Sequence, residues 1–197
     1  MQKKTEALKN LKRKKVERFL RLSGKTIPGQ IDLSSGEERA LGARLLLSET
    51  LEYVIHGLGI TPVVNGEPIV DPDALQYEIN GQEPNTLDAL DGLADVAYTM
   101  FWNAVRFGLP LEDAYDLVCE NNLSKFVPLE NWSDSPGELP RDRWDCDQDI
   151  EWPESVTRVD ALVVDGQFFA VGRDSGGKVR KPSNYRQVNL TRLVANS

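Results

Sequence analysis

The sequence predicts a mainly α-helical protein that ends in a small β-hairpin. Four stretches carry the helical signals of apolar periodicity, capping residues and terminating glycines, and they cover residues 5–22, 37–57, 87–107 and 111–125. The alternating run TRVDALVVDGQFFAVGR predicts a hairpin over residues 156–173 that turns at Asp165-Gly166. With 197 residues, of which 40% are hydrophobic, the chain is long enough for one compact domain or a domain with an appendage.

The first helix, residues 5–22, is strongly basic. Residues 1–21 carry nine Lys/Arg and two Glu, whereas the rest of the chain carries 14 basic and 29 acidic residues, within a total net charge of -8. An acidic body argues against a general nucleic-acid binder. We interpret the basic helix as a solvated face, with contact to nucleic acid or to an acidic partner as the alternative.

The second helix, residues 37–57, has a recognisable start and two faces. Ser35 followed by Glu38 resembles a capping box, and Gly57-Leu58-Gly59 ends the helix. At the helical repeat, one apolar stripe forms the expected core face; it consists of Leu47, Leu51, Val54 and Leu58. A separate stripe consists of Leu45, Glu49, Glu52 and His56.

Between the second and third helices, residues 60–86 form an insertion with a small hairpin signal at Asn65-Gly66. The third helix, 87–107, ends before Gly108, and the fourth, 111–125, has Glu112 and Asp113 near its N-terminus, where the helix dipole favours acids.

Residues 127–155 are acidic, contain proline and hold three of the four tryptophans, which predicts a packed lid or a subunit contact. We therefore expect residues 1–126 to form the core, and the Trp-rich segment, the hairpin and the basic tail of residues 127–197 to pack on the same domain.

Several classes of protein are disfavoured. Cys119 and Cys146 form neither a CxxC pair nor a disulfide framework, which favours a cytoplasmic protein. No apolar run approaches 18 residues and the N-terminus lacks a secretory signal, so we expect no membrane association.

Two carboxylate doublets are the strongest functional signal. Glu49 and Glu52 are three residues apart, and Asp91 and Asp95 are four apart, so each doublet lies on one helix face. Four carboxylates that face one another in a bundle require neutralisation, which a hard divalent cation such as Mg²⁺ provides with oxygen ligands. This pattern favours metal-dependent phosphate chemistry.

Two further stripes complete a possible nucleotide pocket. Tyr98 and Trp102 continue the stripe of Asp91 and Asp95, and the fourth helix has a stripe of Tyr115, Val118, Asn122 and Lys125. Each signal also has a structural interpretation: either doublet can lie on a solvated face, the rings can be core residues, His56 can be a surface or indirectly acting group, and Asn122 and Lys125 can cap a helix end.

Motif order adds a family resemblance. Three segments of the chain resemble the all-α NTP pyrophosphohydrolase superfamily. They are VERFLRLSGKTIPGQ…EERALGARLLLSETLEYV, DGLADVAYTMFWNAVRFGLPLEDAYDLVCENNLSKF and GKVRKP. This superfamily includes MazG-like proteins, dimeric dUTPases and phosphoribosyl-ATP pyrophosphohydrolase. Within it, the chain most resembles the phosphoribosyl-ATP-pyrophosphohydrolase-like branch, which is common in phages and bacteria. The resemblance covers about residues 16–56, 88–126 and 175–183, roughly half of the chain.

The resemblance implies a helical bundle completed in a homodimer or homotetramer, and a hydrolase that converts a (deoxy)nucleoside triphosphate to the monophosphate and pyrophosphate with Mg²⁺ or Mn²⁺. Glu49, Glu52, Asp91 and Asp95 would hold the metal, and Glu49 or Glu52 would activate water. Substrate contacts would come from the remaining matched positions and the neighbouring rings: Tyr98, Trp102, Asn122, Lys125, Lys178 and Lys181. The enzyme would control dNTP pools, in the host cytoplasm if phage-encoded, with dUTP, dCTP and dGTP as candidates.

Four features depart from the family pattern. Ser48 stands where a further Glu is frequent, Trp102 replaces a small glycine, Cys119-Glu120 replaces His-Arg, and the excursion of residues 127–172 is unusual. Ser48 favours an alternative from another class, a non-catalytic MazG-like module that binds a protein or nucleotide partner. A third interpretation is that residues 1–21 bind RNA or DNA.

Overall fold

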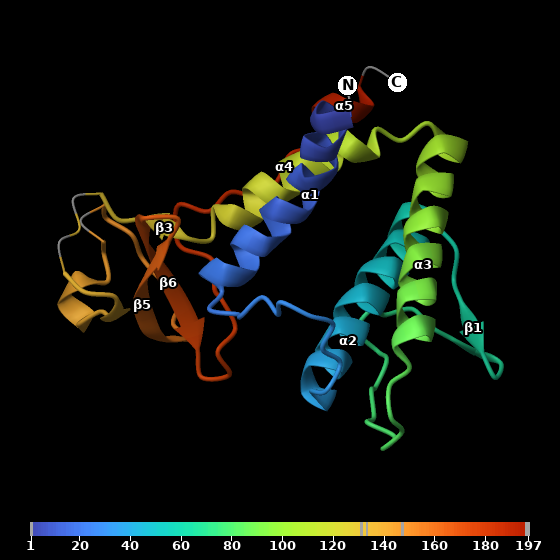
Figure 1. Ribbon diagram of the computed structural model, residues 1–197. Coiled ribbons are helices and arrows are strands. Elements are labelled where there is room, and N and C mark those ends of the chain that lie inside the picture. Colours follow the sequence, from blue (N-terminus) through green and yellow to red (C-terminus); the bar gives the residue numbers. More distant parts are fainter. Residues whose placement is uncertain (1, 131, 133, 147, 196–197) are drawn as a thin grey trace. The chain divides into compact units, whose positions relative to one another are not determined.

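The computed structural model describes residues 2–130, 132, 134–146 and 148–195, and for residues 2–10 only the backbone. Figure 1 shows the elements. The helices are α1 (Gln2–Leu22), α2 (Gly36–Glu52), the π-helix η1 (Tyr53–Gly57), α3 (Thr86–Phe107), α4 (Leu111–Leu123), the 3₁₀-helix η2 (Arg141–Arg143) and α5 (Thr191–Val194). The strands are β1 (Val63–Val64), β2 (Glu67–Pro68), β3 (Val127–Pro128), β4 (Gly137–Glu138), β5 (Val156–Val164) and β6 (Gln167–Asp174).

The expected helical bundle with only a small hairpin is wrong. In the part of the chain that the structure describes, there is 42% helix and 14% strand, with a two-stranded and a four-stranded sheet. The four expected helices and the two hairpin turns are confirmed. The larger sheet arises because β3 and β4, from the acidic, Trp-rich stretch of residues 127–155, pair with the outer edges of the β5–β6 hairpin in the antiparallel order β3-β6-β5-β4.

The chain divides into two compact units. One comprises residues 1–27 and 98–197, and the other comprises residues 28–97. The division falls within α3, between Ala97 and Tyr98. The expectation that residues 1–126 form a functional core stays a prediction.

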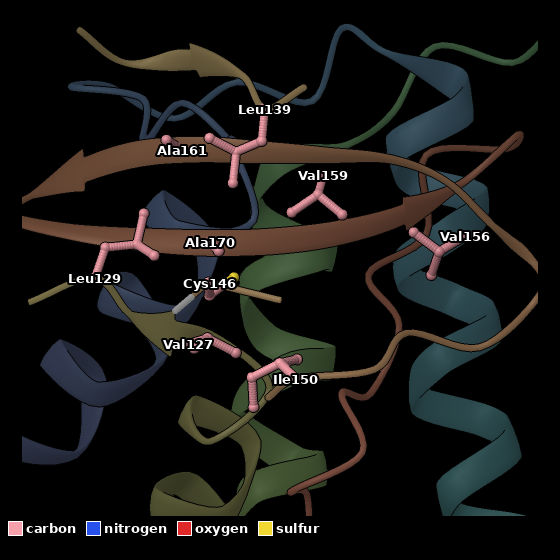
Figure 2. Packing of buried hydrophobic residues seen from close by; sticks show 9 residues of the cluster. All are labelled: Val127, Leu129, Leu139, Cys146, Ile150, Val156, Val159, Ala161 and Ala170. Atoms are coloured by element: carbon pink, nitrogen blue, oxygen red, sulfur yellow. The ribbon is translucent and has the colours of Figure 1, made fainter. Parts of the chain in front are cut away.

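One face of the four-stranded sheet packs against the Trp-rich segment. Val159 and Ala161, two residues apart on β5, point to this face. Figure 2 shows the cluster, whose buried members are Val127, Leu129, Leu139, Cys146, Ile150, Val156, Val159, Ala161 and Ala170. Trp132, Trp144 and Trp152 pack around it half-buried. The Trp-rich segment is therefore part of the core of its own unit.

The other face of the sheet packs against the ends of two helices. Phe169 and Val171 of β6 and Val164 of β5 are buried together with Leu22, at the end of α1, and Phe126, just after α4. Phe19 meets Phe126 edge to face, with ring centroids 5.3 Å apart.

The basic helix α1 lies against α4 (Figure 1). Lys15 Nζ lies 3.0 Å from Asp116 Oδ1 and 3.4 Å from Glu120 Oε1, and the Tyr115 hydroxyl donates to the Lys12 carbonyl at 3.0 Å. The acidic partner of this basic helix is thus, at least in part, the chain's own α4.

The unit of residues 28–97 has little core of its own. None of its hydrophobic side chains, all of which the structure describes, is fully buried. The expected core stripe of α2 is only half-buried at Leu51 and Val54 and is exposed at Leu47 and Leu58.

We expect Gly172→Ala to destabilise the protein by about 1–3 kcal/mol, because overpacking displaces tightly packed neighbours. A Cβ on Gly172 would clash with Cε3 and Cζ3 of the Trp152 ring. Urea unfolding measures the free-energy change. Gly176→Ala is the control, since its Cβ would make only an ordinary 3.5 Å contact with Asp174 Oδ1. Equal stability of the two variants would contradict the packing of Trp152 on Gly172.

We expect the protein to lose stability as pH rises from 10 to 12. Burial, with a smaller contribution from Cys119, raises the pKa of Tyr115 from 10.0 to about 12, and the hydrogen bond to Asp116 raises the pKa of Lys15. Both groups therefore stabilise the fold below their unfolded pKa values and cease to do so as pH passes their folded values.

In unfolding experiments between pH 9 and 12, Tyr115→Phe should reduce this alkaline loss by about 1 kcal/mol, an amount that allows for screening by solvent. The exposed Tyr98→Phe is the matched control. An alkaline loss that is identical in wild type and Tyr115→Phe would show that Tyr115 does not cause it.

Candidate functional site

The first carboxylate doublet lies on the exposed surface of α2. Ser35 caps this helix by accepting from the Glu38 backbone N–H at 3.2 Å, which confirms the expected helix start. Glu49 and Glu52 occupy its last turn, and both are exposed. After Glu52 the helix widens into η1, where the Leu58 N–H donates to the Tyr53 carbonyl, and the exposed His56 lies in this π-helical turn.

The second doublet lies on an exposed stripe of α3. Asn85 caps this helix, since its Oδ1 accepts from the backbone N–H of Leu87 at 3.0 Å and of Asp88 at 3.4 Å. Asp91 and Asp95 are exposed, and the stripe continues along the helix to Tyr98 and Trp102. Trp102 meets Phe107 edge to face, with centroids 6.3 Å apart. Because Tyr98 and Trp102 are both exposed, they are not core residues of a single chain.

A groove shows which face of α2 is turned toward the start of α3. It has a volume of about 660 Å³ and is lined by one side of α2 (Gly36, Arg39, Ala40, Ala43), by the segment of residues 76–85, and by Asp88 of α3. At about 100° per residue, Glu49 and Glu52 lie about 130° and 170° around α2 from that side. Asp91 and Asp95 lie within about 60° of Asp88 around α3.

Glu49 and Glu52 therefore lie on the side of α2 away from the groove, whereas Asp91 and Asp95 lie on the groove side of α3, so the two doublets do not face each other. The members of each doublet lie together on their helix, but among the residues that the structure describes no three His, Cys, Asp or Glu side chains are placed to hold a metal ion. The donors have the oxygen chemistry that Mg²⁺ or Mn²⁺ prefers. Their arrangement in one chain does not fit a complete site for either ion.

The other predicted site residues belong to the unit of residues 1–27 and 98–197. Lys125 Nζ donates to Asn122 Oδ1 at 2.7 Å, just after the end of α4, and lies 5.6 Å from the centre of the Phe19 ring. These contacts agree with a helix-end role. The lysine and amide are adjacent, as the sequence spacing suggested.

Asn121, which the sequence analysis did not select, connects α4 to the C-terminal tail. Its Oδ1 accepts from the Tyr185 hydroxyl and its Nδ2 donates to the Arg186 carbonyl, each at 2.5 Å. Lys181 Nζ lies 4.7 Å from the centre of the Tyr185 ring. The tail thus places Lys181 near the end of α4 through Tyr185, a contact that no local sequence signal predicts.

Lys178 belongs to a turn built around Asp174. The Asp174 carboxylate accepts from the backbone N–H of Gly176 and Lys178 and pairs with Arg180 Nη2 at 2.6 Å. The Lys178 backbone hydrogen bond is the largest cause of the lowered pKa of Asp174. The Lys178 side chain is exposed, whereas Arg180 is engaged by Asp174.

Comparison with known proteins identifies no relative: no family model, no curated protein and no solved structure matches the chain. Among the described helices, none is long and apolar enough to cross a membrane.

Proposed function

We propose that the protein is a nucleotide pyrophosphohydrolase that acts on a (deoxy)nucleoside triphosphate with the help of Mg²⁺ or Mn²⁺ in the cytoplasm. The observation that supports this best is the exposed stripe of α3, where Asp91 and Asp95 are followed by Tyr98 and Trp102. This stripe offers carboxylates for a cation that accompanies phosphate and rings for a base. The motif order around Glu49, Glu52, Asn122 and Lys125 supports the same reaction class.

In the proposed reaction, the oxygen of a water molecule bonds to the α-phosphorus and the bond from that phosphorus to the oxygen bridging to the β-phosphorus breaks. The products are a nucleoside monophosphate and pyrophosphate, and a carboxylate accepts the proton from the water. Glu49 is our candidate for this base. Among the described residues of one chain, the donors do not form a complete site for a metal ion.

We further propose that the protein works as a homodimer or homotetramer. Along α3 the structure leaves large apolar side chains exposed, including Leu87 at 75%, Leu90 at 61% and Leu93 at 59%. At about 60–120 Å² per buried side chain, the exposed apolar residues of α2 and α3 supply most of the roughly 800 Å² per partner of a standard interface. A second copy that packs on this face would bury these residues.

The alternative is a binding module without catalysis. The separation of the two doublets around α2 and α3 favours it, because nothing in one chain then requires all four acids together. A ligand that binds only the folded state raises the melting temperature. A rise with Mg²⁺ or Mn²⁺ that Asp91→Asn with Asp95→Asn removes therefore favours the enzyme, and the absence of any rise favours the module.

We expect an assay of all eight common NTPs and dNTPs with Mg²⁺ and with Mn²⁺ to yield pyrophosphate and a monophosphate from one or two of them. Glu49→Gln should lower kcat at least about 100-fold, the usual contribution of a general base, while circular dichroism stays unchanged. Glu67→Gln, on the β1–β2 hairpin, is the control. Full activity of Glu49→Gln would remove Glu49 from the site, and no turnover of any nucleotide would contradict the proposed reaction.

We expect sedimentation to show a dimer or tetramer that Leu90→Lys with Leu93→Lys dissociates, because each substitution places a charge in the proposed interface. Val163→Lys, which replaces an exposed apolar residue on β5, should leave the assembly intact. A wild-type protein that sediments as a monomer at 100 times the assay concentration would exclude the proposed assembly.

A further inference from the structure

We propose that the groove between α2, residues 76–85 and the start of α3 binds the base of the nucleotide. The inference rests on the proposed function for the identity of the ligand, but the groove itself is a feature of the unit of residues 28–97. Its volume of about 660 Å³ is that of a small-molecule site. None of the residues selected from the sequence lines it.

The lining is rich in side-chain amides. Gln76, Asn80, Gln82 and Asn85 all line the groove, and each amide carries both a donor and an acceptor. Amides read the edges of bases by paired hydrogen bonds. The half-buried ring of Tyr77 and the apolar Ile79 add surfaces for a planar ring.

Two of these amides are already oriented. Asn80 Oδ1 accepts from the Gln82 backbone N–H at 3.0 Å, and Asn85 Oδ1 accepts from the Leu87 backbone N–H at 3.0 Å. Across the described chain, the NH₂ groups of Asn80 and Asn85 have no partner. Because the oxygens are engaged, the groups these two residues offer are donors, which suit the carbonyl oxygens and ring nitrogens of a base.

The charge of the groove selects the base over the phosphates. Glu78, Glu83 and Asp88 line it. Among the described residues of its lining, Arg39 is the one cation, and it donates through Nη1 to the backbone carbonyls of Leu33 and Ser34. Three carboxylates against one engaged guanidinium repel phosphate but accept an uncharged ring.

The groove also leads to one of the carboxylate doublets. Asp91 and Asp95 lie on the same side of α3 as Asp88, about 4.5 Å and 10.5 Å farther along the helix axis. A nucleotide whose base occupies the groove therefore extends its phosphates along α3 toward Asp91 and Asp95. This inference moves the base from the exposed rings of Tyr98 and Trp102 to the groove, because stacking on those rings would distinguish bases poorly, whereas oriented amides distinguish them by their acceptors.

The test measures the binding of nucleosides. This binding requires neither a metal ion nor catalytic turnover. Adenosine, guanosine, cytidine and uridine are titrated into the full chain by calorimetry, with ligand-detected NMR for weak binding. Asn80→Asp with Asn85→Asp keeps both engaged oxygens and removes both donors, so affinity should fall about 10-fold or more. Asn65→Asp, in the β1–β2 turn, is the matched control and should bind as wild type does.

The outcomes separate the groove from the proposed reaction. Nucleoside binding that the double variant weakens supports the groove, even if no triphosphate is hydrolysed and the proposed reaction fails. Three results overturn the groove: equal binding by wild type and double variant, binding that Trp102→Leu abolishes and the double variant retains, and triphosphate hydrolysis without binding of any nucleoside. In the last case the proposed reaction still stands.

Discussion

The antiparallel pairing of β5 with β6 is the interaction on which the unit of residues 1–27 and 98–197 depends. The two faces of this hairpin carry the two hydrophobic clusters, one covered by the tryptophans and the other by the ends of α1 and α4. The two-residue strands β3 and β4 exist only through its outer edges. The close approach of Trp152 to Gly172 ties the Trp-rich segment to the same hairpin.

The regular repeat of α2 decides on which side of the helix Glu49 and Glu52 lie, and therefore whether they can share a ligand with Asp91 and Asp95. Because α2 is α-helical from Gly36 to Glu52, the residues that face the groove and the residues that carry Glu49 and Glu52 lie on different sides. A single chain thus presents two separate pairs of acids. For the proposed enzyme, a complete cation site requires donors from outside this arrangement.

Charge separates the roles within the unit of residues 28–97. The groove combines oriented amide donors with carboxylates, so it suits an uncharged ring, whereas Asp91 and Asp95 farther along α3 suit a cation that accompanies phosphate. The proposed division places recognition of the base and chemistry of the phosphate on one helix face. The cationic residues Lys125 and Lys181 belong to the other unit, where Asn122 and Tyr185 hold them in place.

The sequence by itself determined the local structure: the four long helices, the Ser35 cap and the turns at Asn65-Gly66 and Asp165-Gly166, because capping and turn formation depend on neighbouring residues. It also determined that each doublet shares a helix face. Only the tertiary structure decided the four-stranded sheet, the docking of Lys15 on Asp116 and the link from Asn121 to the tail. It also decided the groove and the separation of Glu49 and Glu52 from Asp91 and Asp95. These features join residues far apart in the chain, so no local pattern encodes them.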